Sequence, residues 1–168
     1  MQEVPFHFNA SKNLEILSKT AFLTTHYGDK TNVMVTAWGA LGVMWKLPVF
    51  VAMVRQSRYS YSLIEKTREF TVTFPYTDMS KTAEICGRLS GKNIDKMSLT
   101  GLTTRPAHKI LTPVLDVSGM HLECSVIYAR PMSADKLDSA IQELWYDRQR
   151  NDYHVFFVSQ ILDSYIIP

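Results

Sequence analysis

The sequence predicts a mainly β fold with helices, of the α+β class, built as a closed antiparallel barrel decorated by helices. Three observations predict this fold. Strand-like segments are long and numerous, most of them are joined as hairpins, and helical segments occur only between some of them. The regular strand–helix alternation of a doubly wound sheet is missing from the chain. The sequence also lacks a GxGxxG motif after a strand, which disfavours a Rossmann dinucleotide site.

The N-terminal third is predicted to hold a short helix followed by strands. Residues 9–18 show helical spacing of apolar side chains. Residues 20–27 and 32–38 predict a hairpin, because the turn sequence Gly-Asp-Lys at 28–30 separates them. Residues 48–55 form a nearly continuous apolar run, which predicts a strand buried on both faces.

The middle of the chain alternates helices with one strand. Ser57 is a good N-cap residue for a helix over 58–67. Residues 69–74 alternate polar and apolar side chains, as a half-buried strand does. A second helix is expected over 79–89, and one more helical turn over 93–98. The helices among them would decorate the barrel.

Two long strands are predicted near the C-terminus, over 120–130 and 153–167. Between them, residues 134–146 show helical periodicity through Leu137 and Ile141. The last strands are therefore expected to be joined by a helical excursion instead of a tight turn.

Composition limits the classes of function. A chain of 168 residues that is 46% hydrophobic and 20% charged suits a single domain over 1–168. The net charge of +2, with scattered lysines and arginines, argues against a nucleic-acid partner. No apolar stretch approaches the roughly 20 residues that span a bilayer, so no membrane partner is expected. Cys86 and Cys124 form no disulfide framework and, with no signal pattern, favour a cytoplasmic location.

The junction at residues 55–60 carries candidate phosphate ligands. Arg55, Ser57, Arg58 and Ser60 lie within six positions where an apolar strand gives way to a helix. The start of a helix offers free N–H groups and the positive end of the helix dipole. Hydroxyl and guanidinium groups add donors that suit a phosphate monoester. The alternative is an ordinary capped helix with solvated arginines.

The segment NVMVTAWG at 32–39 is a candidate site for a flat ring. In a strand, Thr36 and Trp38 share one face while Ala37 points to the other. Small residues beside Gly39 let a ring approach the backbone, where N–H and C=O groups can pair with its polar edge. An edge strand with an interface tryptophan is the alternative interpretation.

The segment CGRLSGKNIDK at 86–96 is a candidate anion loop. Ser90, Gly91, Lys92 and Lys96 combine a hydroxyl, a flexible backbone and two ammonium groups. A helix–loop–helix joint with surface lysines explains the same residues equally well.

The five histidines show no metal-ligand spacing, so no metal site is expected. His154 precedes an apolar strand and is a candidate for facing a ligand pocket, with a structural strand histidine as the alternative. The chain contains no GxSxG and no HExxH motif.

Taken in order, these segments resemble the flavin reductase-like proteins with an FMN-binding split β-barrel, and the flavoredoxin branch in particular. The resemblance runs from about Asn32 to Tyr165. The motifs that carry it are NVMVTAW (32–38), RQSRYSYSLI (55–64), CGRLSGKNIDKM (86–97), LEC (122–124) and YH (153–154).

The resemblance implies a homodimer that holds FMN non-covalently near the subunit interface. On this analogy, the backbone at 36–38 lies along the isoalloxazine ring and His154 lies near its reactive side. The other residues assigned to FMN by the resemblance are Arg55, Ser57, Arg58 and Ser60 at the phosphate, Ser90, Gly91 and Lys92 closing over the cofactor, and Lys96 assisting. Lys92 stands where the family has arginine, which keeps the charge and loses the forked donor.

The function that the resemblance implies is redox chemistry with FMN. One form is an NAD(P)H-dependent flavin reductase that passes reduced flavin to another enzyme. The other is a flavoredoxin-like electron carrier with a protein donor or acceptor. A third hypothesis is an FMN-binding or scaffold protein without redox turnover, because Ser159 and Gln160 replace a Gly-Glu pair of the family.

Overall fold

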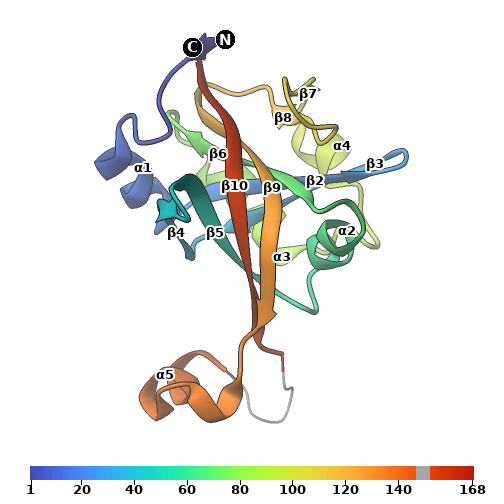
Figure 1. The fold of residues 1–168 in the computed structure, drawn as a ribbon. Coiled ribbons are helices and arrows are strands. Elements are labelled where there is room, and N and C mark those ends of the chain that lie inside the picture. The colour runs from blue at the N-terminus through green and yellow to red at the C-terminus, as the bar shows by residue number, and fades with distance from the viewer. Residues whose placement is uncertain (147–151) are drawn as a thin grey trace.

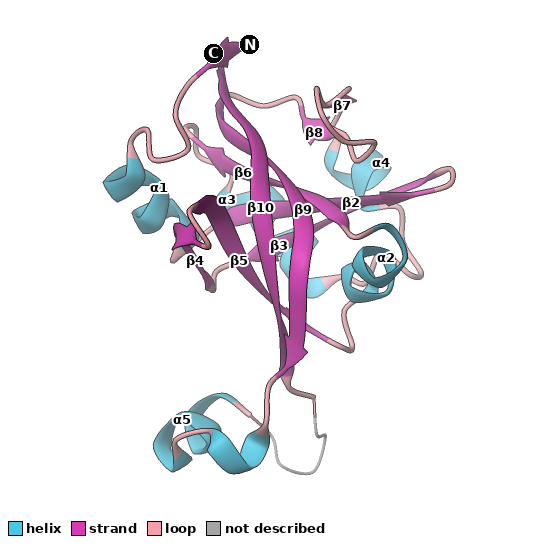
Figure 2. Ribbon diagram, viewed as in Figure 1, coloured by secondary structure: helices cyan, strands magenta, loops and turns pink. Residues whose placement is uncertain are grey.

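The computed structural model describes residues 1–146 and 152–168, and a large antiparallel sheet dominates it (Figures 1 and 2). The strands are β1 (Gln2–Glu3), β2 (Ala21–Tyr27), β3 (Lys30–Thr36), β4 (Gly39–Met44), β5 (Leu47–Arg55), β6 (Glu69–Pro75), β7 (Thr104–Arg105), β8 (Val114–Leu115), β9 (Gly119–Pro131) and β10 (His154–Ile167). The helices are α1 (Ala10–Leu17), α2 (Tyr59–Thr67), α3 (Ser80–Arg88), α4 (Lys96–Thr100) and α5 (Ser139–Trp145), with a 3₁₀ turn, η1 (Ala134–Lys136). No helix within the described ranges is long and apolar enough to cross a membrane. One dominant antiparallel sheet with several helices confirms the predicted α+β class.

The large sheet runs in the order β3-β2-β6-β9-β10-β5-β4, and β1 adds to the end of β10. Every neighbouring pair is antiparallel. β3 and β5 stand far apart in this order, yet they contact each other, so the sheet curls round on itself. In Figure 1, β9 and β10 cross the molecule as its two longest strands and carry α5 at the end remote from both termini.

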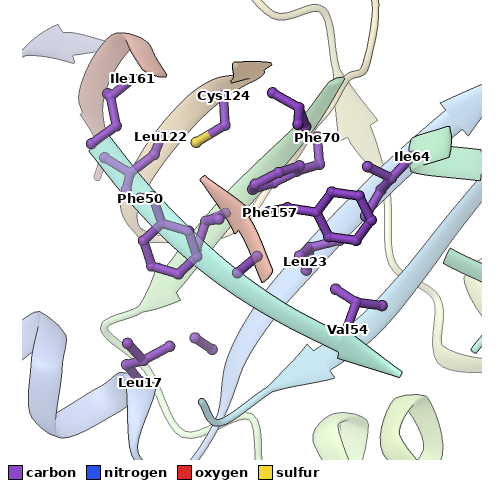
Figure 3. Packing of buried hydrophobic residues seen from close by; sticks show 14 of the residues in the cluster. Leu17, Leu23, Phe50, Val54, Ile64, Phe70, Leu122, Cys124, Phe157 and Ile161 are labelled. Carbon is purple, nitrogen blue, oxygen red and sulfur yellow. The ribbon is translucent and has the colours of Figure 1, made fainter. Parts of the chain in front are cut away.

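The core lies inside the curled sheet. Phe50, Phe70 and Phe157 come from three different strands, and each is fully buried. In Figure 3 their rings converge on a cluster that also includes Leu122 from β9 and Ile64 from α2. Burying one such side chain stabilises the fold by about 1.5–3 kcal/mol before conformational entropy is subtracted. This cluster holds β5 and α2 in place, and both elements border the candidate site.

The predicted strand over 32–38 is shorter at its C-terminal end than expected. β3 ends at Thr36, and a strand that was not predicted, β4, begins at Gly39. The close approach of the chain to β5 explains the glycine, because a Cβ at position 39 would lie 2.6 Å from the carbonyl oxygen of Val51. Ala37 and Trp38 therefore lie in a connection between strands, and the prediction that Trp38 occupies a strand face was wrong.

The predictions for the burial of β5 and β6 were both wrong. β5 was expected to be buried on both faces. On β5, Phe50 and Val54 are buried while Val51 and Met53 are only half-buried, so one face alone belongs to the core. β6 was expected to be half-buried, yet both of its faces are buried. The loop before β8 covers its outer face, where Thr71 Oγ1 donates a hydrogen bond to the carbonyl oxygen of Pro113.

Two helix starts differ from the predictions. The N-cap of α2 is Arg58, and Ser57 is not the cap. The predicted turn over 93–98 is displaced to α4, whose N-cap Asp95 accepts hydrogen bonds from the backbone N–H groups of Met97 and Ser98. A carboxylate at this position satisfies two of the free N–H groups of the first turn. The predicted helical segment over 134–146 divides into η1 and α5.

A buried histidine on β9 makes stability depend on pH. His121 is fully buried, with Nε2 3.0 Å from the carbonyl oxygen of Val117 and Nδ1 3.1 Å from Oγ1 of Thr73. Burial lowers the pKa of its ring from 6.5 to about 4, although the hydrogen bond to Val117 opposes that shift. Between these two values the unfolded chain binds a proton that the folded chain does not.

We therefore expect the free energy of unfolding to fall as the pH falls from about 6.5 to about 4. This histidine contributes a slope of up to about 1.4 kcal/mol per pH unit. Denaturant unfolding of the wild type and of His121→Gln across this range measures it, and the variant should show the shallower slope. Equal slopes in the two proteins would contradict the assignment to His121.

Candidate functional site

A cavity of about 260 Å³ opens beside Trp38, and we name it the Trp38 cavity. It lies where β3 ends, between the first residues after that strand, β5, and the start of β10. Six of the predicted site residues line it: Thr36, Ala37, Trp38, Arg55, Arg58 and His154. Sequence reasoning did not single out its other lining residues, which are Met34, Val35, Met53 and Trp145.

The shape of the Trp38 cavity follows from the end of β3. The hydroxyl of Thr36 donates a hydrogen bond of 3.2 Å to the carbonyl oxygen of Trp38, which fixes the bend after the strand. The Trp38 ring then lies with its centroid 4.9 Å from the His154 ring and 5.0 Å from the Trp145 ring. Three aromatic rings therefore border a cavity that residues 34–37 also line. Such a wall suits a flat, partly apolar ligand.

A smaller cavity of about 100 Å³ lies at the start of α2, and we name it the Ser60 cavity. Six predicted residues line it: Ser57, Arg58, Ser60, Ser90, Gly91 and Lys96. Its remaining lining residues are Asn32, Met34, Tyr59, Arg88 and Leu89. Met34 and Arg58 line both cavities, so the two spaces adjoin. Lys92 is the predicted residue that lines neither of them.

Arg58 stands between the two cavities. It caps α2, and its Nη1 donates a hydrogen bond of 3.1 Å to the carbonyl oxygen of Gly87 on α3. That contact engages one guanidinium nitrogen and fixes where the side chain lies. The planar guanidinium offers five N–H donors in total, so it can hold an anion while it keeps this bond.

Ser60 and Lys96 supply buried donors to the Ser60 cavity. The Oγ of Ser60 accepts a hydrogen bond of 2.8 Å from Asn32 Nδ2, which leaves its own hydrogen for an acceptor. Lys96 is only 5% exposed, and its ammonium donates to the carbonyl oxygens of Val33 and Cys86 at 2.9 and 2.7 Å. Burial lowers the pKa of Lys96. Its third N–H group remains for a ligand in the cavity that it lines.

Two predicted phosphate ligands are engaged by the protein itself. The carboxylate of Asp152 accepts hydrogen bonds from the backbone N–H and the hydroxyl of Ser57, at 3.1 and 2.7 Å. The same carboxylate lies 3.8 Å from the guanidinium of Arg55. Arg55 also donates to the carbonyl oxygens of Asp152 and Trp145, at 2.9 and 2.8 Å. Arg55 therefore tethers the segment that places Trp145 beside Trp38.

His154 is buried at the edge of the Trp38 cavity. Its Nδ1 lies 2.7 Å from the hydroxyl oxygen of Tyr146. Burial, with smaller contributions from the charges of Arg55 and Arg58, lowers its pKa to about 4, while Asp152 opposes the shift. Burial raises the pKa of Tyr146, so its hydroxyl keeps its proton at neutral pH. At neutral pH the ring of His154 is uncharged and can act as a hydrogen-bonding group, not as a fixed cation.

Among protein families, the chain matches the flavin reductase like domain over residues 15–167. Among curated proteins, the chain is 30% identical over 99 residues to an uncharacterised protein of Archaeoglobus fulgidus. That alignment covers 59% of this chain and 55% of the relative, so the chain matches little more than half of its length.

Solved structures share this fold. A flavoredoxin from Methanosarcina acetivorans superimposes with a TM-score of 0.69 at 24% identity, over 88% of this chain and 68% of that one. An FMN-binding protein from Thermus thermophilus superimposes with a TM-score of 0.68 at 17% identity, over 88% and 69% of the two chains. At these identities the likeness shows the fold, and it confirms the predicted split barrel.

Proposed function

Since the chain belongs to the flavin reductase-like domain family, we propose that it binds FMN and works as a redox protein. The observation that carries the proposal is the pair of adjoining cavities that share Arg58 and Met34. FMN joins a flat tricyclic ring to one phosphate through a short polar chain. The wide, aromatic Trp38 cavity suits the ring, and the narrow Ser60 cavity, lined by hydroxyl and cationic groups, suits the phosphate.

The residues divide between these two tasks. At the ring end, the backbone at 36–38 would pair with its polar edge, and Trp38, Trp145 and His154 would exclude water from it. At the phosphate end, Arg58 would donate from its guanidinium, and Ser60, Ser90 and Lys96 would add further hydrogen bonds, with Gly91 bordering the cavity. Ser57 and Arg55 serve this site less directly. The carboxylate of Asp152 accepts from both donors of Ser57, and the carbonyl oxygens of Asp152 and Trp145 accept from Arg55.

When bound, FMN supplies the hydride- and electron-accepting chemistry, so the protein needs no nucleophile of its own. His154 has a part in holding the ring end of the site. Its Nδ1 shares a hydrogen bond with the hydroxyl of Tyr146, so the direction of that bond sets which ring nitrogen carries the proton of the neutral imidazole.

Two redox roles remain to be separated, a flavin reductase that takes hydride from NADH or NADPH and a flavoredoxin-like carrier that exchanges electrons with a protein. The visible spectrum of the freshly purified protein, followed by FMN titration, tests the common proposal. Absence of flavin bands together with no uptake of added FMN would refute it and favour a scaffold role. Rapid NAD(P)H oxidation with added FMN supports the reductase, and rapid reduction by a ferredoxin-like donor supports the carrier.

A homodimer is part of the proposal. Exposed apolar side chains gather on α5, where Ile141, Leu144 and Trp145 are 45%, 70% and 49% exposed. Sedimentation equilibrium of the purified protein tests the homodimer. A cytoplasmic location is also part of the proposal. Cys86 and Cys124 are both free and buried, which suits the reducing conditions of that compartment.

Asp152→Asn is expected to raise the affinity for FMN by about two- to fivefold. The carboxylate of Asp152 lies against Ser57 at the Ser60 cavity, so it repels an incoming phosphate. Asparagine keeps the shape of the side chain and removes its charge. FMN titration at low ionic strength measures the effect, with Asp135→Asn on η1 as the matched control. Weaker binding by the variant would show that Asp152 supports the site instead of competing for it.

A further inference from the structure

Three potential metal ligands meet where β1 lies along the end of β10. Glu3, His108 and Asp163 each offer one ligand atom, and these atoms all lie within 4.8 Å of one another. We name this group the His108 cluster. Glu3 belongs to β1, Asp163 to β10, and His108 to the segment between β7 and β8. The spacing of the histidines predicts no metal site, because His108 and Asp163 are 55 positions apart and only folding brings them together.

The register of the sheet places the two carboxylates on one face. Glu3 pairs with Tyr165 across the ladder between β1 and β10. Asp163 precedes Tyr165 by two residues on β10, so the two side chains point to the same side of that strand. Glu3 and Asp163 are therefore diagonal neighbours, which lie within reach of each other when one side chain is long.

Contacts with buried groups hold His108 beside these carboxylates. Its backbone N–H donates a hydrogen bond of 2.7 Å to Oε1 of Glu123, which is fully buried. Its ring lies with its centroid 4.7 Å from the Tyr165 ring, and the Tyr165 hydroxyl donates to the same oxygen of Glu123 at 2.8 Å. Its Nδ1 lies 2.7 Å from Oδ2 of Asp163. The fold thus arranges the cluster in advance, which lowers the entropic cost of binding an ion.

The His108 cluster has an excess of negative charge and is open to solvent. Two carboxylates face one imidazole, and an imidazole is uncharged when it binds a metal ion. Among the ion pairs of the residues that the structure describes, Glu3 takes part in none, and Asp163 pairs with His108 alone. The side chain of His108 is 34% exposed and Glu3 is exposed, so a cation can reach the cluster.

We propose that the His108 cluster binds one divalent transition-metal ion, and that Zn²⁺ fits it best. One imidazole nitrogen and two carboxylate oxygens are ligands that Zn²⁺ accepts, with water in the fourth position. At its bond lengths of about 2.0–2.2 Å, ligand atoms lie about 3.4 Å apart, so small side-chain rotations complete the site. The ion takes the place of the proton shared by His108 and Asp163. A nitrogen ligand disfavours Mg²⁺ and Ca²⁺, which prefer oxygen alone.

One ion at this place joins three segments, β1, the segment between β7 and β8, and β10. In Figure 1 both termini lie at this end of the molecule, opposite α5. Asp163 lies nine residues along β10 from His154, which is about 30 Å in an extended strand. The site is therefore a structural clamp remote from the Trp38 cavity, and the inference does not rest on the proposed flavin function.

The test titrates ZnCl₂ into the full chain by calorimetry, with no affinity tag and after EDTA treatment and dialysis. We expect one Zn²⁺ per chain in the wild type, and at least about a tenfold loss of affinity in Glu3→Gln and in His108→Gln. Loss of a residue that merely orients a ligand costs about 10- to 100-fold, and loss of a ligand should cost no less. Glu65→Gln on α2 and His26→Gln on β2 are the matched controls and should bind Zn²⁺ as the wild type does.

Two further measurements separate ligation from an effect on folding. Zn²⁺ at about 100 times its Kd should raise the unfolding midpoint of the wild type by about 5–10 °C, and that of Glu3→Gln by at most about half as much at the same concentration. Glu3 lies on an exposed two-residue strand, so this variant should fold even where loss of the contact with Asp163 destabilises His108→Gln. Co²⁺ should give the visible absorption bands of a tetrahedral site in the wild type and in neither ligand variant.

The outcomes decide the inference without reference to FMN. Absence of Zn²⁺ binding in the wild type overturns it, and His108 and Asp163 then form an ion pair only. Equal affinities in the wild type and both ligand variants also overturn it, because the ion would lie elsewhere on the chain. Because flavin uptake is measured separately, failure of this inference leaves the proposed function standing, and the reverse holds as well.

Discussion

Arg58→Ala is expected to weaken FMN binding by about ten- to a hundredfold. The guanidinium of Arg58 stands where the Trp38 and Ser60 cavities meet, and its bond to the carbonyl oxygen of Gly87 fixes it there. A charge-assisted hydrogen bond to a phosphate contributes about 1.5–3 kcal/mol, which corresponds to that range of affinity. Titration of the apoprotein with FMN measures the loss directly.

Two further variants make the Arg58 result specific. Arg58→Lys retains the positive charge without the forked donor, so we expect an affinity between those of the wild type and Arg58→Ala. Arg130→Ala removes an exposed arginine from β9, outside the Trp38 and Ser60 cavities, and should bind FMN as the wild type does. Wild-type affinity in Arg58→Ala, with its thermal unfolding unchanged, would remove this residue from the phosphate site.

The long strands could be predicted because their signals are local. β9 and β10 contain extended apolar stretches, and both lie within a residue or two of where the pattern placed them. β4 could not be found in the same way. It begins at Gly39 because the chain passes close to Val51 of β5, and that approach depends on the tertiary structure, not on the local sequence. The burial of Thr71 likewise depends on a loop some 40 residues further along the chain, at Pro113.

In the candidate site too, local motifs could be predicted and contacts between distant segments could not. Short motifs located Arg58, Ser60 and the residues at 36–38, because each motif stands at the end of a strand or the start of a helix. Asp152 was not predicted as a site residue, because it belongs to no motif and its hydrogen bonds to Ser57 span a separation of 95 residues. Trp145 was also missed. It belongs to a predicted helical segment, but only folding brings its ring against Trp38.

Gly91→Ala is expected to lower FMN affinity by at least about tenfold and the free energy of unfolding by about 1–3 kcal/mol. A Cβ at position 91 would lie 1.8 Å from Oδ1 of Asn32 and 3.2 Å from Cδ1 of Tyr59. Asn32 is buried, and its amide donates to the hydroxyl of Ser60. The methyl group therefore pushes Asn32 away from Ser60 or moves the 90–92 loop, and either change deforms the Ser60 cavity.

The cause of that effect can be isolated with two comparisons. Gly42→Ala is the matched control, because a Cβ there meets nothing within 4 Å, and it should change neither FMN affinity nor stability appreciably. The double variant Gly91→Ala with Asn32→Ala removes the clashing side chain, so it should be no less stable than Asn32→Ala alone. Additive losses in the double variant would instead mean that Gly91 is required for the path of its own loop. In that case the contact between Gly91 and Asn32 would not be what shapes the cavity.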